Sequence, residues 1–407
     1  MKKKRKLLII ANVTNVHTHK FIEEFKNRNW DLKIISIQPP NIENVEKFKT
    51  LIISLPTYKI YRMLIKLPFF KYSEYHNINS GVKLYEPYSI TAMFTYLYLL
   101  IFIKRYVKEF GPDGIFTIYL TMNGFLAALS GNKNIISSAA GIDVSIHKKL
   151  SVKYWLNHPS VLRYAVNRAH KIISFDRKTF EPIFIKKKCG LSNAMWLNHW
   201  GINTENFKPR GKDLVENEGI CRFICSRPYR SEFDFERILL ALKKFHDINA
   251  NIEFIIATGA RSNSNKRGLE KVLSKVNCLG ASFITILDHI DYGELPSLIS
   301  SCDIYIDPIN VEKYPQTAAW GVSGSLLEAM SCGLIPVISQ RPSIDWILPE
   351  EAQPFRYEGD YESLYVAIVN AYNSRTDYAL RMKMRKVILE KANWDKNISL
   401  IEKEFNV

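Results

Sequence analysis

Three features that would place the chain in other protein classes are absent or weak. The six cysteines form no CxxC pair and no cluster with histidines, which argues against a disulfide framework and a zinc site. The longest apolar run, residues 93–103, has about half the length that a membrane-spanning helix needs. The LLII after the first lysines is too short for the apolar part of a signal peptide. We therefore expect a globular protein with free thiols, in a reducing compartment and without a membrane span.

Acidic residues are scarce in the first half of the chain. Residues 1–200 contain 31 Lys and Arg against 12 Asp and Glu, whereas residues 201–407 contain 25 against 28. A basic half suits nucleic acid, an anionic membrane surface or a phosphorylated acceptor, and it also suits a purely solubilising face. No nucleic-acid-binding motif is legible. We therefore expect no nucleic acid, and we prefer an anionic membrane or a lipid-linked acceptor as the partner.

The chain does contain a regular alternation of short apolar strands and helices. The runs KLLII, DLKII and IFTIYL in the first half, and CRFICS, IEFIIAT and CDIYID in the second, show no strict polar alternation. Such strands are typical of parallel sheets that are covered by helices on both faces. The alternation restarts after the Gly and charge-rich segment 211–219, which predicts an interdomain linker. The pattern therefore predicts an α/β protein with two doubly wound domains.

The segment WGVSGSLLEAMSCGLIPVIS, residues 320–339, carries the strongest functional signal. Ser323 and Ser325 are good N-terminal residues for a helix, and Gly324 lets a ligand come close to the backbone. Free N–H groups in the first turn of such a helix can face a diphosphate. Glu328 lies one turn further along, and Gly333 predicts the end of the helix. From these residues alone, a phosphate-binding helix and an ordinary strand and helix unit with a solvated Glu328 both remain open.

The run SLLEAMSCGLIPVIS resembles the donor-site motif of the retaining glycosyltransferases of family 4, which have the two-domain GT-B architecture. The resemblance implies that Glu328 is the second glutamate of an E-x7-E pair and binds the ribose hydroxyls of a nucleotide. The residues that it implies at the phosphates are Ser323, Gly324, Ser325 and Leu327. Trp320 stands where the first glutamate is expected. Because an indole cannot accept hydrogen bonds from sugar hydroxyls, either the donor sugar is held differently or another residue of the 307–320 loop takes that role.

The resemblance extends over nearly the whole chain. The segment NHWGINTENFKP resembles the end of the family's first domain, with Asn203 where Asp is usual, and KANWDKNISLIEKEF resembles its C-terminal helix. The implied fold is GT-B, with two Rossmann-like domains and a cleft between them. Its parts are an acceptor-side domain (1–207), a linker (208–218), a donor-binding domain (219–385) and a C-terminal helical segment that packs back toward the first domain (386–407).

Arg227, directly after CRFICS, stands where the family places an arginine on the donor diphosphate. A guanidinium suits this role because it donates two parallel hydrogen bonds and keeps its charge. The lysine that usually follows five residues later is Glu232 here, and Phe233 and Asp234 resemble a variant with an aromatic and Asn pair. The candidates for a second positive charge are Arg230, Arg261 and Lys266. Gly259 and Arg261 stand where the family has a glycine turn near the base and phosphates.

The acceptor side is marked less clearly. Asp143 in AAGIDV resembles a family aspartate at the cleft, although an aspartate in such a loop also serves as a turn or helix cap. His17 in VHTHK matches a histidine in the first loop of related transferases. Asn123 and Gly124, after IFTIYL, are expected to border the acceptor. We name Asp143 and His17, with Arg227, as the candidate catalytic residues.

The resemblance implies a retaining, hexosyltransferase-like enzyme that takes a sugar from a UDP or GDP sugar. The expected acceptor is a glycan or a lipid-linked molecule of cell-surface polysaccharide synthesis, at the inner face of the cell membrane. No metal site and no further cofactor are expected, because Asp303 and Asp307 of DIYID lie near different ends of a strand. A nucleotide-sugar 2-epimerase and a non-catalytic nucleotide-sugar-binding partner are the alternatives.

Overall fold

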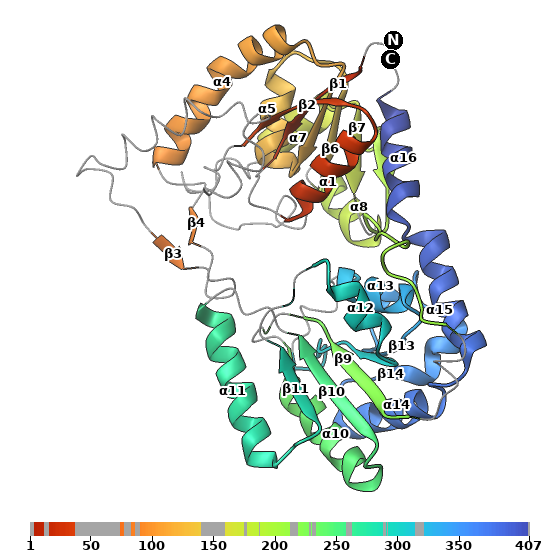
Figure 1. Ribbon diagram of the computed structural model, residues 1–407. Coiled ribbons are helices and arrows are strands. Elements are labelled where there is room, and N and C mark those ends of the chain that lie inside the picture. Colours follow the sequence, from red (N-terminus) through yellow and green to blue (C-terminus); the bar gives the residue numbers. More distant parts are fainter. Residues whose placement is uncertain are drawn as a thin grey trace. The chain divides into compact units, whose positions relative to one another are not determined.

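The structure is a computed structural model that describes residues 4–11, 16–36, 74–76, 83–85, 90–139, 159–174, 177–186, 188–211, 219–227, 229, 233–257, 263–287, 290, 292–313 and 321–405. The chain divides into two compact units (Figure 1). The first comprises residues 1–75, 84–197 and 399–407, and the second comprises residues 76–83 and 198–398. A separate two-stranded sheet pairs β3 (Glu74–His76) with β4 (Lys83–Tyr85).

The first unit contains a six-stranded sheet whose strand pairs are all parallel, in the order β2-β1-β5-β6-β7-β8. Its strands are β1 (Lys6–Ile10), β2 (Asp31–Ile35), β5 (Gly114–Ile118), β6 (Ile135–Ser138), β7 (Lys171–Ser174) and β8 (Ala194–Trp196). The accompanying helices are α1 (Val16–Asn27), α4 (Ile90–Phe110), α5 (Phe125–Leu129), α7 (Pro159–Arg168) and α8 (Arg177–Lys186). Every residue of β5 and β6 is buried, as expected for central strands that helices cover on both faces.

The last residues of the chain complete the first unit. Helix α16 (Trp394–Glu404) ends there, and Glu402 accepts hydrogen bonds from Trp30 Nε1 at 2.8 Å and from Arg28 Nη1 at 3.0 Å. The ring of Phe405 packs edge-on against Trp30 and occupies the space that a Cβ would need at Gly114. Strand β5 therefore begins at a glycine, because an aromatic ring from the far end of the chain lies against it.

Two sequence runs of the first unit and the elements that contain them have different bounds. The helix that contains the apolar run 93–103 begins at Ile90, and none of the described helices is long and apolar enough to span a membrane. The strand IFTIYL ends at Ile118, because Tyr119 adopts a φ of 77° and a five-residue π-helix (Leu120–Gly124) follows. A non-glycine residue in this left-handed region is uncommon, and no residue-level pattern marks it in advance.

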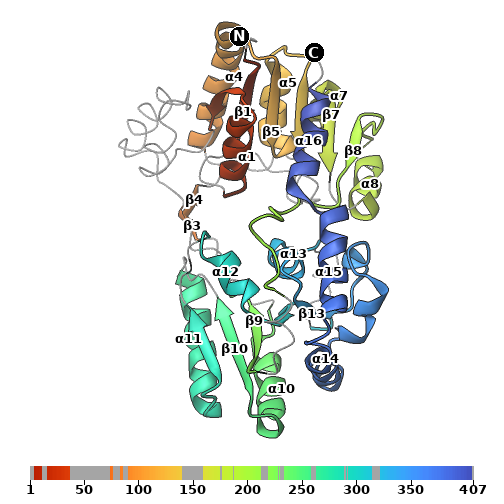
Figure 2. The same cartoon turned by 45° about the vertical axis from the view of Figure 1, so that its right-hand side comes forward.

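The second unit repeats the architecture. Its six-stranded sheet has the order β11-β10-β9-β12-β13-β14, with every pair parallel. Figure 2 labels β9, β10 and β13 of this sheet. The strands are β9 (Cys221–Cys225), β10 (Ile252–Ala257), β11 (Ile284–Leu287), β12 (Ile304–Ile306), β13 (Ile335–Ser339) and β14 (Arg356–Tyr357). The helices are α10 (Phe235–Ile248), α11 (Asn263–Leu279), α12 (Leu295–Ser300), α13 (Gly324–Ser331), α14 (Tyr361–Asn373) and α15 (Tyr378–Lys391). The predicted pair of doubly wound domains is thus confirmed.

The segment 201–207, which resembles the end of the family's first domain, belongs to the second unit. Its backbone pairs with the chain just before α16, since Ile202 N–H donates to Ala392 O and Trp394 N–H donates to Ile202 O, each at 2.9 Å. Gly201 has a φ of 92°, and a Cβ there would collide with the backbone at Trp394. Asn203 Oδ1 accepts from the N–H groups of two following residues at 3.0 Å, a role that an aspartate would fill equally well.

A cluster of buried charged residues lies at the N-terminal end of β12 in the second sheet. Asp303, directly before β12, accepts hydrogen bonds from Arg210 and from Arg381 of α15, the latter at 3.0 Å, and from the N–H of Arg222 at 2.9 Å. Arg381 is fully buried, and burial lowers the pKa of its guanidinium while the charge of Asp303 opposes the shift. Because Arg210, Arg222 and Arg381 are distant in sequence, one carboxylate joins three parts of the unit.

All six cysteines are free, as expected. Cys225 and Cys332 lie in the core of the second unit, and burial raises the pKa of each thiol to about 12. Both are therefore inert packing residues rather than nucleophiles.

Candidate functional site

The candidate site lies in the second unit, where β9, β12 and β13 end side by side in the sheet. In open α/β sheets, ligands bind outside the carboxyl ends of the strands, because the loops there carry variable side chains and the helices present their N-termini. Arg227 follows β9, and the loop after β12 leads into α13. The sequence motif therefore lies at the carboxyl ends of the strands, where a ligand is expected.

The N-terminus of α13 is built as the motif predicts. Ser323 is the N-cap, with extended backbone angles and a side-chain oxygen that accepts from Leu326 N–H at 3.2 Å. The backbone N–H groups of Gly324 and Ser325 have no partner within the helix, as at the start of any helix. A Cβ built at Gly324 would meet no atom of the described residues within 4 Å, apart from its own helix and chain neighbours. As far as the described residues show, the first turn therefore has open space next to amides that the helix leaves unpaired, and Gly333, with a φ of 74°, follows the helix as predicted.

A chain of three hydroxyl groups links the first turn of α13 to strand β12. Ser325 Oγ lies 3.0 Å from Tyr305 Oη and 3.1 Å from Ser323 Oγ. Tyr305, on β12, is fully buried, and burial together with the charge of Asp307 raises the pKa of its phenol well above the usual value. The Ser325 hydroxyl is therefore engaged within the protein, and the group that this residue can offer a ligand is its backbone N–H.

Glu328 lies one turn further along α13 and is 7% exposed. Its Oε1 atom accepts a hydrogen bond from Tyr292 Oη at 3.2 Å. Burial, and then the charge of Glu328, raise the pKa of the Tyr292 phenol, which therefore stays a neutral donor at ordinary pH. The predicted ribose-binding carboxylate is thus present on the helix that carries the unpaired amides, and it already has one donor.

Arg227 is partly buried, and its guanidinium stacks on the ring of Phe233 at 4.6 Å from the ring centroid. Among the described residues, its Nε atom is buried without a hydrogen-bond partner. β9 pairs with β12, whose Tyr305 lies 3.0 Å from Ser325 Oγ at the start of α13. Arg227 and the α13 N-terminus therefore follow neighbouring strands of one sheet, and their joint contact with a ligand stays a prediction.

Three polar side chains in the described part of the 307–320 loop have contacts within the protein. Asp307 is fully buried and accepts from Arg341 Nη2 at 2.6 Å. Asn310 donates to Asp234, the N-cap of α10, at 2.6 Å, and Glu312 forms an ion pair with Arg237. Burial therefore keeps Asp307 and Asn310 from replacing the missing first glutamate, whereas the Glu312 side chain is 57% exposed and Trp320 lies outside the described residues.

Several predicted site residues are not placed. Asp143, Gly259, Arg230 and Arg261 lie outside the described part of the chain, and so do the side chains of His17 on α1 and Lys266 on α11. Leu327 is placed, but its side chain is fully buried in the core and its N–H donates to the Ser323 carbonyl at 3.2 Å. Any contribution of Leu327 to ligand binding would therefore be indirect.

Asn123 and Gly124 lie in the first unit, in the π-helix after β5. Asn123 is 4% exposed, and its side-chain amide donates to the carbonyl of Ile118 at the end of the strand. A Cβ at Gly124 would lie 3.1 Å from Ser137 Oγ of β6. Both residues therefore shape the turn at the carboxyl edge of the first sheet, and their contact with an acceptor stays a prediction.

Two features of the site were not predicted from the sequence. The first is the buried ion pair of Asp307 with Arg341, and the second is the contact of Tyr292 with Glu328. The sequence signal was limited to a carboxylate after β12, an arginine after β13 and an aromatic residue before α12. Among the described residues there is no cluster that could hold a metal ion.

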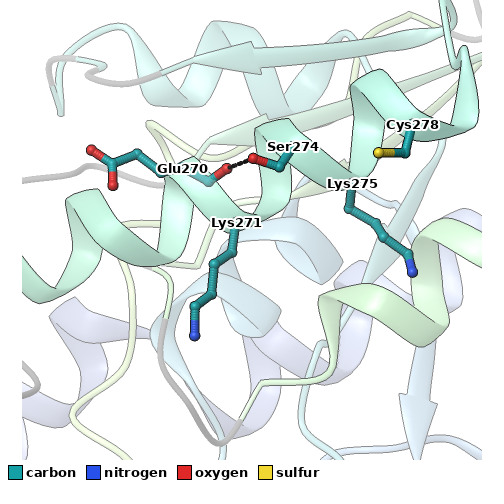
Figure 3. A pocket seen from close by; sticks show the side chains of 5 residues that line it. All are labelled: Glu270, Lys271, Ser274, Lys275 and Cys278. Atoms are coloured by element: carbon teal, nitrogen blue, oxygen red, sulfur yellow. Dashed lines mark hydrogen bonds between the residues drawn. The ribbon is translucent and has the colours of Figure 1, made fainter.

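A hollow of about 520 Å³ lies along α11, and no residue of the 320–339 motif lines it (Figure 3). Its lining residues all come from this one helix, and its acidic and basic side chains diverge rather than face a common point (Figure 3). Lys275 is paired with Glu236 of α10 at 2.8 Å, and Ser274 donates to the Glu270 carbonyl at 2.9 Å. This surface therefore lacks the convergent groups of a binding site.

Two family models match the chain. One, described as Glycosyl transferase 4-like, matches residues 6–176, and the other, described as Glycosyl transferases group 1, matches residues 226–374. Each model therefore falls largely within one of the two units. No curated protein is significantly similar to the chain in sequence.

Solved structures with a similar fold match the chain over almost its full length. A glycosyltransferase from Rickettsia africae aligns with a TM-score of 0.69 at 12% identity, over 99% of this chain and 98% of its own. Sucrose-phosphate synthase from Thermosynechococcus elongatus aligns with a TM-score of 0.64 at 13% identity, over 98% of each chain. Anabaena HepE in complex with UDP aligns with a TM-score of 0.64 at 12% identity, over 98% of each chain. At these identities the likeness establishes the fold.

Proposed function

The chain belongs to the family 4 retaining glycosyltransferases of group 1, which have the GT-B fold and use nucleotide sugars, and from this premise we propose that it transfers a hexose to a glycan or lipid-linked acceptor. The observation that carries the donor half of this proposal is the open N-terminus of α13. It combines unpaired amides, empty space at Gly324 and the carboxylate of Glu328 on one helix.

We propose that a UDP or GDP sugar binds at this helix. The diphosphate would accept hydrogen bonds from the N–H groups of Gly324 and Ser325 and from Arg227, and Glu328 would accept from the ribose hydroxyls. HepE, which shares the fold, is known in complexes with UDP and with UDP-glucose. That protein makes UDP and UDP-glucose sensible first ligands to test with this chain.

The same groups would support the chemistry without a metal ion. As the bond between the sugar and the diphosphate breaks, negative charge grows on the leaving phosphate. Preorganised helix amides and a guanidinium stabilise that charge more strongly than they stabilise the intact donor. The stacking of Arg227 on Phe233 favours this role, because it holds the guanidinium in place at the end of β9. We retain Asp143 and His17 as candidates for the acceptor side.

We also propose that the enzyme works at the cytoplasmic face of the cell membrane, in the synthesis of a surface polysaccharide or glycoconjugate. The excess of basic residues in the first half of the chain supports this. Lys104, Arg105 and Lys108 lie exposed on α4, next to the exposed Ile101, and Arg105 is paired with the exposed Glu109. A basic face with an apolar residue suits the surface of an anionic bilayer.

Incubation of the purified protein with UDP-glucose, UDP-GlcNAc, GDP-mannose and related donors tests the proposal. Slow hydrolysis of one donor, with release of the sugar in its original anomeric form, is the expected result. Release of a free 2-epimer would identify an epimerase instead. Tight binding without turnover would favour the non-catalytic partner, which the tryptophan at position 320 makes a specific alternative.

A further inference from the structure

The side chain of Tyr292, outside α13, is hydrogen-bonded to the proposed ribose-binding carboxylate. It lies in the loop before α12 and donates to Glu328 Oε1 at 3.2 Å. Its ring meets the ring of Phe207 edge-on, with the centroids 5.9 Å apart. Phe207 is fully buried, so the tyrosine is held at its base by the core and at its tip by the carboxylate.

The hydrogen bond from Tyr292 restricts the rotation of the Glu328 side chain. A glutamate on a helix has several rotamers. When a ligand binds only one of them, its affinity falls with the fraction of the protein in which the glutamate adopts another rotamer. A phenol donates one hydrogen bond, whereas a carboxylate accepts several. The bond to Tyr292 is therefore compatible with further bonds from two ribose hydroxyls.

We propose that Tyr292 is a positioning residue of the donor site, which fixes the Glu328 carboxylate in the orientation that receives the ribose hydroxyls. The proposal rests on the function proposed above. It assigns Tyr292 no contact with the reacting atoms. The contribution of the tyrosine to affinity should pass entirely through Glu328 and the ribose.

The exposure of the two residues supports this assignment. Tyr292 is 45% exposed, whereas its partner Glu328 is 7% exposed. A tyrosine that served only to fill the core would be buried with Phe207. Instead, its hydroxyl end reaches the carboxylate while much of the side chain remains at the surface, as expected at the rim of a ligand site.

The test is a double-mutant cycle that removes the Tyr292 hydroxyl from the protein and the two ribose hydroxyls from the ligand. The affinities of the wild-type chain and of Tyr292→Phe are measured by calorimetry for UDP and for 2′,3′-dideoxy-UDP, with the guanosine pair in parallel. The phenylalanine keeps the ring on Phe207 and removes only the hydroxyl. We expect Tyr292→Phe to weaken binding of the ribonucleotide about three- to tenfold, and to leave binding of the dideoxynucleotide unchanged.

Two further variants sharpen the result. In a Glu328→Gln background, Tyr292→Phe should have no additional effect on ribonucleotide affinity, because the two residues act on one contact. Tyr378→Phe, which removes a tyrosine hydroxyl at the start of α15, is the matched control and should leave all affinities unchanged. Thermal unfolding of each variant checks that the unit stays folded.

The possible failures are distinguishable. If the wild-type chain binds neither UDP nor GDP, the proposed function and this inference fall together. If it binds one of them and Tyr292→Phe weakens the ribonucleotide and the dideoxynucleotide equally, or weakens neither, the inference alone is overturned. A loss confined to the ribonucleotide, and absent in the Glu328→Gln background, would support it.

Discussion

Gly324→Ala is the most direct test of the site, because the structure separates its effect on stability from its effect on binding. A Cβ at this position would meet no atom of the other described parts of the chain within 4 Å, and the residue is not in the left-handed region of the backbone. Gly324 is the first residue of α13, where alanine restricts the unfolded chain more than glycine does. The free energy of unfolding should therefore stay the same or rise by up to about 1 kcal/mol.

Binding should respond in the opposite direction. A diphosphate that accepts from the N–H groups of Gly324 and Ser325 must come within about 3 Å of the backbone, and the new methyl group competes for that space. Steric conflicts of this size cost about 1 to 3 kcal/mol, which corresponds to about a 5- to 150-fold loss of nucleotide affinity. Calorimetric titration with UDP and GDP, combined with thermal unfolding, measures both quantities on the same sample.

The matched control is Gly190→Ala in the first unit. Gly190 also has open space at the Cβ position and a φ outside the left-handed region, but it lies far from α13 in the sequence. It should change neither nucleotide affinity nor donor hydrolysis. If Gly324→Ala is stable and binds nucleotide as tightly as the wild type, the α13 N-terminus is not the phosphate site.

Four other outcomes are expected. Glu328→Gln should weaken nucleotide binding by about 1 to 3 kcal/mol, and unchanged affinity would refute its ribose contact. Arg227→Ala should lower the turnover number more than it lowers the melting temperature, and equal activity would remove it from the site. Asp303→Asn should destabilise the second unit by about 3 to 5 kcal/mol in chemical unfolding, since it leaves Arg381 buried without a counter-charge, and a loss under 1 kcal/mol would contradict that account. Binding to phosphatidylglycerol vesicles should weaken as salt rises, and indifference to salt would favour a solubilising role for the basic half.

The parts of the fold that depend on local chemistry could be predicted from the sequence. Strands such as β9 and β13 are apolar without alternation, and this pattern follows directly from burial on both faces. The start of α13 follows from the capping chemistry of Ser323, and its end follows from the left-handed glycine at Gly333.

The parts that depend on distant residues could not be predicted. Asp303 and Arg381 are 78 positions apart, and nothing local to either marks the other as its partner. The same holds for Tyr292 and Glu328, which meet across 36 positions. Tyr119 breaks a strand by adopting a conformation that its side chain disfavours, and only the surrounding structure imposes it.

The contacts of residues 201–210 decide how the second unit can be produced on its own. A fragment that began after the linker, near residue 219, would lose Arg210 and leave Asp303 with fewer partners. Arg385 would lose its acceptors at the Phe207 and Thr204 carbonyls, at 2.8 and 3.1 Å. Such a fragment would therefore be expected to aggregate, whereas one that starts at residue 198 keeps these bonds and is the piece to express for ligand screening.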